Sequence, residues 1–236
     1  RANAMSSPER PLPPGQPALP LVGDTLTFLG DQYRFLARNA AKHGAVFRSN
    51  ILFRPTAVLS GPDGTAAFND ESKVVRAGGM PSHVVEFFGG ESLPLLDGDA
   101  HRARKAQVMA AFRRDALAEY LPDVQSLVEA SFVRWSRAGE VRGVDEFKRL
   151  ALEAIARNML SMGPGPELDS VRESFAVLSS AFAALPIPLP GTAFSRALKA
   201  RDRILGVLRR AVAEHRARTF NDGLARVLTA EGPDRS

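Results

Sequence analysis

The chain has 236 residues, 44% of them hydrophobic, so it can bury a substantial core. It contains no cysteine, which excludes disulfide bonds, cysteine-ligated zinc and a cysteine nucleophile within this chain. The 31 Lys and Arg against 26 Asp and Glu give a formal net charge of +5, but the arginines alternate with acidic residues, so we do not expect nucleic-acid binding.

The sequence predicts neither a membrane-spanning segment nor a secretory signal peptide. No apolar run approaches the length that crosses a bilayer, and the charged and then apolar pattern of a secretory signal is missing, so we expect a cytoplasmic protein. Residues 1–4 precede Met5 and are interpreted as an expression remnant. The segment 5–23 is rich in proline, which excludes helix and central strand there.

Local patterns predict alternating short elements up to residue 99. The apolar spacing predicts a helix over 24–43, which ends at the basic pair before Gly44. Two β-prone runs around Arg54-Pro55 predict a hairpin over 45–60, and a short helix follows over 63–69. The glycine-rich stretch 77–99 predicts a long irregular loop with about one turn of helix.

Beyond residue 99 the pattern is helical almost throughout. Apolar residues at spacings of three and four predict helices over 100–112, 116–138, 144–160, 168–185 and 194–218. Asn221-Asp222 then caps a last short helix over 223–230. The fold class predicted is therefore mainly α, with a small β-sheet near the N-terminus.

Two basic side chains open the predicted helix over 100–112. His101 and Lys105 lie four residues apart and so share one face of the helix. Two donors on one face suit an anionic ligand, although the spacing by itself favours a solvated basic first turn.

Two apolar segments could line a pocket. Phe87 and Phe88, followed by two glycines, fit either core packing or the lining of an apolar pocket. The proline-rich segment 185–194 fits a rigid connection, a lid or a membrane-touching tip, of which we expect the first.

Common catalytic motifs are missing from the sequence. It contains no glycine-rich phosphate loop, no Gly-x-Ser-x-Gly and no His-Glu-x-x-His. The four histidines are scattered, so we expect no metal site built from paired ligands.

The order of these segments resembles the first half of the cytochrome P450 superfamily, the haem-thiolate monooxygenases. The matching segments are Pro13-Pro14-Gly15, Lys42-His43-Gly44, Ser60-Gly61-Pro62, the Gly-x-x-His stretch Gly98 to His101, Arg104-Lys105 and Ala111-Phe112. Further segments are similar to the branch that contains the retinoic acid hydroxylases and their bacterial relatives: Phe47 to Leu52, Gly90 to Leu93, Gly139 to Val141 and Leu189 to Phe194. The resemblance covers 11–236 and implies the N-terminal part of a P450 domain over 24–236. The oxygen-activating helix and the cysteine ligand loop would follow it.

The resemblance also implies roles for individual residues, although surface exposure or simple packing explains several of them equally well. His101 and Lys105 match the positions that hold the haem propionates. The residues that would line the distal substrate pocket are Phe87, Phe88, Phe175, Leu178, Phe182 and Leu185. An acidic electron-transfer partner would dock near Arg102, Arg113 and Arg114.

Cofactor and partners follow from the same resemblance. It implies haem, whose cysteine ligand is not in this chain, and electrons from NAD(P)H through a ferredoxin- or flavodoxin-type donor. It implies an apolar terpenoid- or retinoid-like substrate, and as a partner the missing C-terminal half of the same fold. No catalytic residue is assigned here, and this segment alone is expected to be inactive. The alternatives are a non-catalytic helical ligand-binding fragment without haem and a structural helical domain without a small ligand.

Overall fold

The structure is a computed structural model that describes residues 12–15, 23–51, 54–89, 91–181 and 187–230. It contains two compact units, Arg1–Pro81 and Ser82–Ser236. The prolines and leucines of 16–22 and the residues 1–11 lie outside the described parts, so most of the proline-rich segment stays a prediction.

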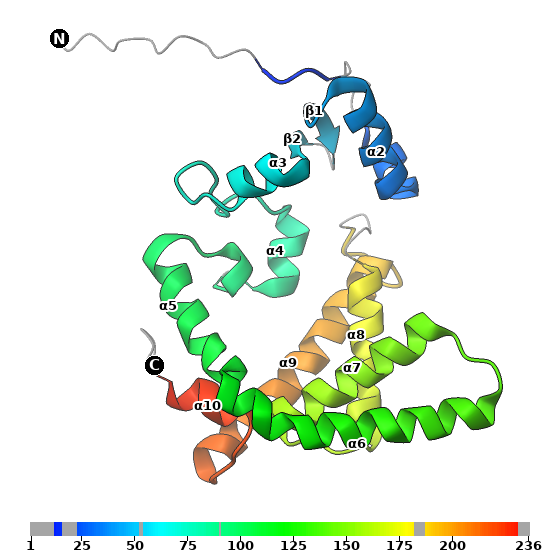
Figure 1. Cartoon of the computed structure of the whole chain (residues 1–236), viewed down its shortest axis with the longest axis vertical. Helices are drawn as coiled ribbons and strands as arrows, with labels where there is room; N and C mark the ends of the chain where they lie inside the picture. The colour runs from blue at the N-terminus through cyan, green and yellow to red at the C-terminus, as the bar shows by residue number, and fades with distance from the viewer. Residues whose placement is uncertain (1–11, 16–22, 52–53, 90, 182–186, 231–236) are drawn as a thin grey trace. The chain divides into compact units, whose positions relative to one another are not determined.

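The N-terminal unit combines short helices with one β-hairpin (Figure 1). Its elements are α1 (Thr25–Gly30), α2 (Gln32–His43), β1 (Val46–Ile51), β2 (Arg54–Leu59) and α3 (Gly61–Phe68). The prediction of one continuous helix over 24–43 was wrong. Asp31 has extended backbone angles, and its carboxylate accepts a 2.9 Å hydrogen bond from the backbone N–H of Arg34, so a new helix begins after it.

The predicted hairpin is confirmed. β1 and β2 pair antiparallel in a register that runs from Val46 opposite Leu59 to Ile51 opposite Arg54. Burial alternates along β1, as the two-residue period of a strand requires. Phe47, which is 1% exposed, packs with Phe35 of α2 and forms the core of this unit.

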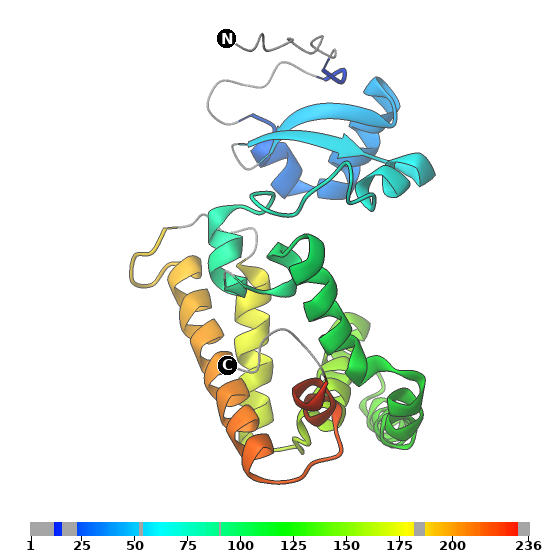
Figure 2. The ribbon, with the colours of Figure 1, turned by 90° about the vertical axis from the view of Figure 1, so that its left-hand side faces the viewer.

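The C-terminal unit is helical throughout its described parts (Figures 1 and 2). Its elements are α4 (Ser82–Phe88), the 3-10 turn η1 (Leu93–Leu95), α5 (Gly98–Met109), the 3-10 turn η2 (Ala110–Phe112), α6 (Arg114–Ala138), α7 (Gly143–Leu160), α8 (Pro166–Ser180), α9 (Ala193–Ala217) and α10 (Gly223–Thr229). Both views show α8 and α9 side by side, and α6 packs against α7. Every helix in the described parts is too short or too polar to pass through a lipid bilayer.

Two predictions for this unit need correction. The stretch 77–99 is more ordered than expected, because it contains the seven-residue helix α4 and the turn η1. α8 ends at Ser180, before the predicted end at 185, and 182–186 lie outside the described residues. The remaining helices match the predicted ranges within about two residues, which is the usual uncertainty of helix ends.

The short helix α10 holds three other helices in place. Arg226 of α10 forms ion pairs with Asp115 at 3.0 Å and Glu119 at 2.7 Å, both on α6. At Gly223 a Cβ atom would lie 2.2 Å from the sulfur of Met159 on α7, so a larger residue there would require the Met159 side chain to move. α10 also contacts α5, the helix that carries the predicted propionate residues.

Candidate functional site

The candidate site begins at the N-terminal end of α5. Gly98, the first residue of the helix, has φ +56°, a left-handed conformation that a side chain disfavours. Asp99 lies in the first turn, where its negative charge interacts favourably with the helix dipole. The chain therefore changes direction at Gly98 and presents the first turns of α5 at a fixed orientation.

His101 and Lys105 occupy successive turns on one face of α5, as predicted. His101 is 9% exposed, and Lys105 is exposed. The imidazole is therefore fixed in the protein interior, whereas the ammonium group can reach a ligand from the surface side. An imidazole N–H and an ammonium group one turn apart can each donate to a carboxylate.

This donor set fits the carboxylate side of haem. The two propionates of haem are carboxylates, which accept hydrogen bonds. His101 and Lys105 both carry N–H donors, and no acidic residue lies between them in the sequence. The iron side is different, because the sequence contains no cysteine and so offers no thiolate. The residues present can therefore hold the edge of the cofactor but cannot supply a thiolate ligand to its metal.

Phe87 and Leu178, two of the predicted pocket residues, meet in one apolar cluster. Phe87 is 5% exposed, and its ring centroid lies 5.3 Å from that of Phe194 on α9. Ala181 and Ala197 complete the buried core of the cluster, and Leu178 packs against it. α4, α8 and α9 thus meet in this cluster, in which two predicted pocket residues pack against residues of α9 that the sequence did not assign to the pocket.

The other predicted pocket residues are placed differently. Phe88 is 43% exposed and Phe175 is 54% exposed, so both keep apolar surface that a ligand or another part of the protein can cover. Phe182 and Leu185 lie outside the described residues.

The three arginines predicted to face an electron-transfer partner are all at the surface. Arg102 pairs with Asp99 at 2.7 Å and Arg113 with Asp115 at 3.8 Å, and Arg114, the first residue of α6, is exposed. Exposed ion pairs of this kind contribute little energy, so they would exchange readily for pairs with a partner.

His83 is a buried side chain near the candidate site that was not predicted from the sequence. His83 of α4 is 7% exposed, and its ring lies edge-on to Phe87 with centroids 6.4 Å apart. Its Nε2 atom is buried and makes no hydrogen bond in the part of the chain that the structure describes. Its position one helical turn before Phe87 is the sequence signal that could have placed it there.

Comparison with protein-family models identifies the family to which this arrangement of helices belongs. The family model for cytochrome P450 matches residues 13–227, which is most of the chain. The chain therefore belongs to the cytochrome P450 family, and it corresponds to the N-terminal half of that fold.

Individual relatives agree with this assignment. The cholesterol 22-hydroxylase CYP90B27 of Paris polyphylla is 30% identical over 220 residues, covering 90% of this chain and 45% of the relative. Cytochrome P450 26A1 of Danio rerio is 29% identical, covering 82% of this chain and 40% of the relative. The solved structure of retinoic acid bound cyanobacterial CYP120A1 matches with a TM-score of 0.82 at 24% identity, covering 94% of this chain and 52% of that one. The chain thus spans about half the length of the relatives it matches.

Proposed function

We propose that this chain is the part of a cytochrome P450 monooxygenase that holds the haem propionates and contributes to the distal pocket. The observation that carries the proposal is the pairing of His101, buried, with Lys105, exposed, on one face at the start of α5. A buried donor fixes the orientation of one carboxylate, and a surface donor neutralises the other. The C-terminal half of the fold would supply the thiolate ligand.

Haem, when bound, supplies the oxygen-activating chemistry that the side chains of this segment lack. The residues of this chain would orient the cofactor and exclude water from one side of it. Electrons would come from NAD(P)H through a ferredoxin- or flavodoxin-type donor that docks near Arg102, Arg113 and Arg114. We also propose that the protein is cytoplasmic, as expected from the sequence.

The proposed substrate is an apolar terpenoid- or retinoid-like molecule. Two of the relatives support this class, since one is a cholesterol 22-hydroxylase and one was solved with retinoic acid bound. The exposed rings of Phe88 and Phe175 supply apolar surface for such a molecule. The closed cluster around Phe87 would support those rings rather than contact the ligand itself.

The test is haem retention in the full-length protein. Charge-assisted hydrogen bonds contribute about 1.5–3 kcal/mol each, so His101→Gln and Lys105→Ala should each speed haem transfer to apomyoglobin by about ten- to a hundredfold. Lys148→Ala, which removes an exposed lysine from α7, is the matched control and should transfer haem at the unmodified rate. Equal transfer rates in all four proteins would show that this face of α5 does not hold the propionates.

A further inference from the structure

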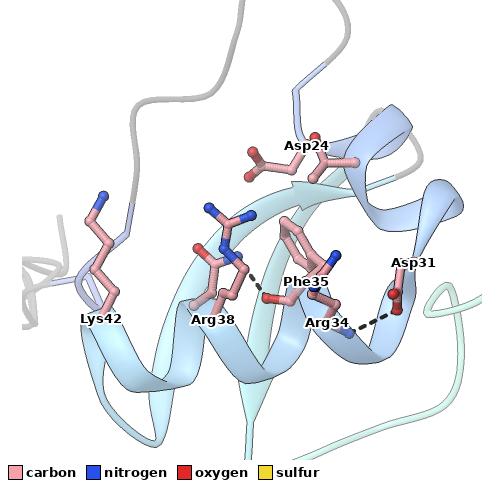
Figure 3. A pocket seen from close by; sticks show the side chains of 8 residues that line it. Asp24, Asp31, Arg34, Phe35, Arg38 and Lys42 are labelled. Carbon is pink, nitrogen blue, oxygen red and sulfur yellow. Dashed lines mark hydrogen bonds between the residues drawn. The ribbon is translucent and has the colours of Figure 1, made fainter.

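A concave site lies in the N-terminal unit, and none of the residues assigned to haem and substrate lines it. A cavity of about 300 Å³ runs along α2 beside α1, and Figure 3 shows it from close by. Arg34, Arg38 and Lys42 line it from successive turns of α2. We call this concavity the α2 groove.

Within the described part of the chain, the three cations of the α2 groove form no ion pair. They are spaced by four residues and therefore lie along one face of α2, and all three are exposed. α2 itself contains no Asp or Glu. None of the three side chains forms an ion pair within the described ranges, so their charges are available to a ligand.

The two carboxylates of the α2 groove are already held by the protein. Asp24 accepts a 2.6 Å hydrogen bond from the hydroxyl of Ser49, and Asp31 accepts one of 2.9 Å from the backbone N–H of Arg34. One oxygen of each carboxylate takes no part in these bonds and can still accept a hydrogen bond from a ligand hydroxyl. The groove therefore combines unpaired cationic donors with fixed acceptors.

We infer that the α2 groove binds a phosphate monoester of a small polyol. A phosphate group carries nearly two negative charges and three acceptor oxygens, which suits Arg38 with a further cation one turn away on either side. A guanidinium group pairs with phosphate through two parallel hydrogen bonds, which a single ammonium cannot do. The hydroxyls of the polyol would donate to Asp24 and Asp31. The volume is at the lower end of small-molecule sites, so the ligand is small.

The same phosphate chemistry could come from a soluble metabolite or from a lipid headgroup, and two titrations of the full-length protein separate these sources. Glycerol 3-phosphate is titrated by calorimetry, with sodium chloride at equal ionic strength as the blank. Vesicles of phosphatidylcholine with or without phosphatidylinositol 4-phosphate, a lipid that carries a phosphate monoester on a polyol headgroup, are tested by flotation. Binding to glycerol 3-phosphate alone identifies a soluble ligand, and binding to the anionic vesicles alone identifies a headgroup.

Variants at Arg38 test whether the α2 groove is the site. Arg38→Gln removes the charge and keeps the aliphatic stem, and it should weaken phosphate binding by about ten- to a hundredfold. Arg38→Lys keeps the charge without the planar fork and should recover part of that loss. Arg209→Gln, which removes an exposed arginine from α9, should bind as the unmodified protein does.

Three results would overturn the inference. They are no response to either phosphate ligand, an equal response to an acidic peptide of the same charge, and binding by Arg38→Gln as tight as that of the unmodified protein. Thermal melting monitored by circular dichroism shows that each variant is folded, so a loss of binding cannot be attributed to unfolding. Because no haem or substrate readout is used, the outcome is independent of the proposed monooxygenase function.

Discussion

His215 and Asp222 form a buried pair in which the ring Nε2 lies 2.8 Å from a carboxylate oxygen, with side chains 1% and 4% exposed. The other ring nitrogen lies 2.7 Å from the carbonyl oxygen of Ala211. Asp222 also accepts a 2.7 Å hydrogen bond from Ser161 and caps α10 through the N–H of Ala225. One carboxylate therefore joins the ends of α7 and α9 to the start of α10.

Removing this carboxylate should destabilise the protein strongly. Asp222→Ala leaves one nitrogen of a buried imidazole without its carboxylate partner and removes a helix cap, so we expect the free energy of unfolding to fall by about 2–4 kcal/mol. Urea denaturation of the full-length protein measures it. Asp202→Ala, at a position 69% exposed on α9, is the control and should change the value by less than about 0.5 kcal/mol. Similar losses in the two variants would contradict the role given to the buried pair.

Phe87 and Phe88 should respond differently to truncation. Phe87 packs against Phe194 in a closed cluster, so Phe87→Ala should lower the free energy of unfolding by about 3–5 kcal/mol. Phe88 is 43% exposed, so Phe88→Ala should cost far less stability. The proposed retinoid-like substrate class predicts that this variant weakens retinoic acid binding instead. Urea denaturation and spectral titration with retinoic acid check the pair. A reversed order of the two stability losses would be incompatible with this placement.

Glu146 should link stability to acidic pH. The indole N–H of Trp135 and the guanidinium of Arg134 hold the pKa of its carboxyl below the ordinary value of 4.5. A group with a lowered pKa in the folded state stabilises the fold above its unfolded pKa, and that contribution is lost as the pH falls through the folded pKa.

The test of that link is a pH titration of Trp135→Phe. This variant removes the largest cause of the shift, so the pKa of Glu146 should rise toward 4.5. NMR titration of the carboxyl carbon measures it in both proteins. An unchanged midpoint would show that the indole contact does not control the carboxyl.

The apolar residues exposed on α6 and α7 should make the isolated segment associate. They include Leu121, Phe132, Val144, Phe147 and Ile155, each 57–68% exposed. The rings of Phe132 and Phe147 both contact Trp135, with centroids 5.3 and 5.7 Å away, and a contiguous apolar surface usually marks an interface or an aggregation site. Residues 1–236 produced alone should therefore elute as oligomers in light-scattering chromatography, and Phe132→Ser with Phe147→Ser should reduce the association. A monomer that unfolds cooperatively would contradict the expectation.

The sequence was sufficient for elements that depend on local pattern. The hairpin followed from β-prone runs around Arg54-Pro55, and the long helices followed from apolar spacing. The division at Asp31 was missed, because an Asp within a helical pattern is common and its capping bond is visible only in the structure. In the stretch 77–99 the sequence predicted about one turn of helix, because the glycine- and proline-rich surroundings suggest a loop, but α4 has seven residues. Its stabilising contact, Phe87 with Phe194, joins residues far apart in the sequence.

For the candidate site, the sequence predicted which residues share a helix face but not how deeply each is buried. A spacing of four places His101 and Lys105 on one face, but spacing cannot show that one is buried and the other exposed. Phe87 and Phe88 are neighbours of identical chemistry, and only the packing of α4 against α9 distinguishes them. The spacing of four residues places Arg34, Arg38 and Lys42 on one face of α2. Only the structure shows that they form no ion pair among the described residues, and that Asp24 and Asp31 bond to the Ser49 hydroxyl and the Arg34 backbone N–H.

The central claim is that the full-length protein is a haem-binding P450 enzyme. Its most direct test is the visible spectrum of that protein after reduction and addition of carbon monoxide. The intact mass is measured on the same sample. A mass about twice the 25.5 kDa of this chain and a thiolate-type Soret band are predicted. A protein of that mass with no Soret band would contradict the account and would favour a helical ligand-binding protein that has lost its haem.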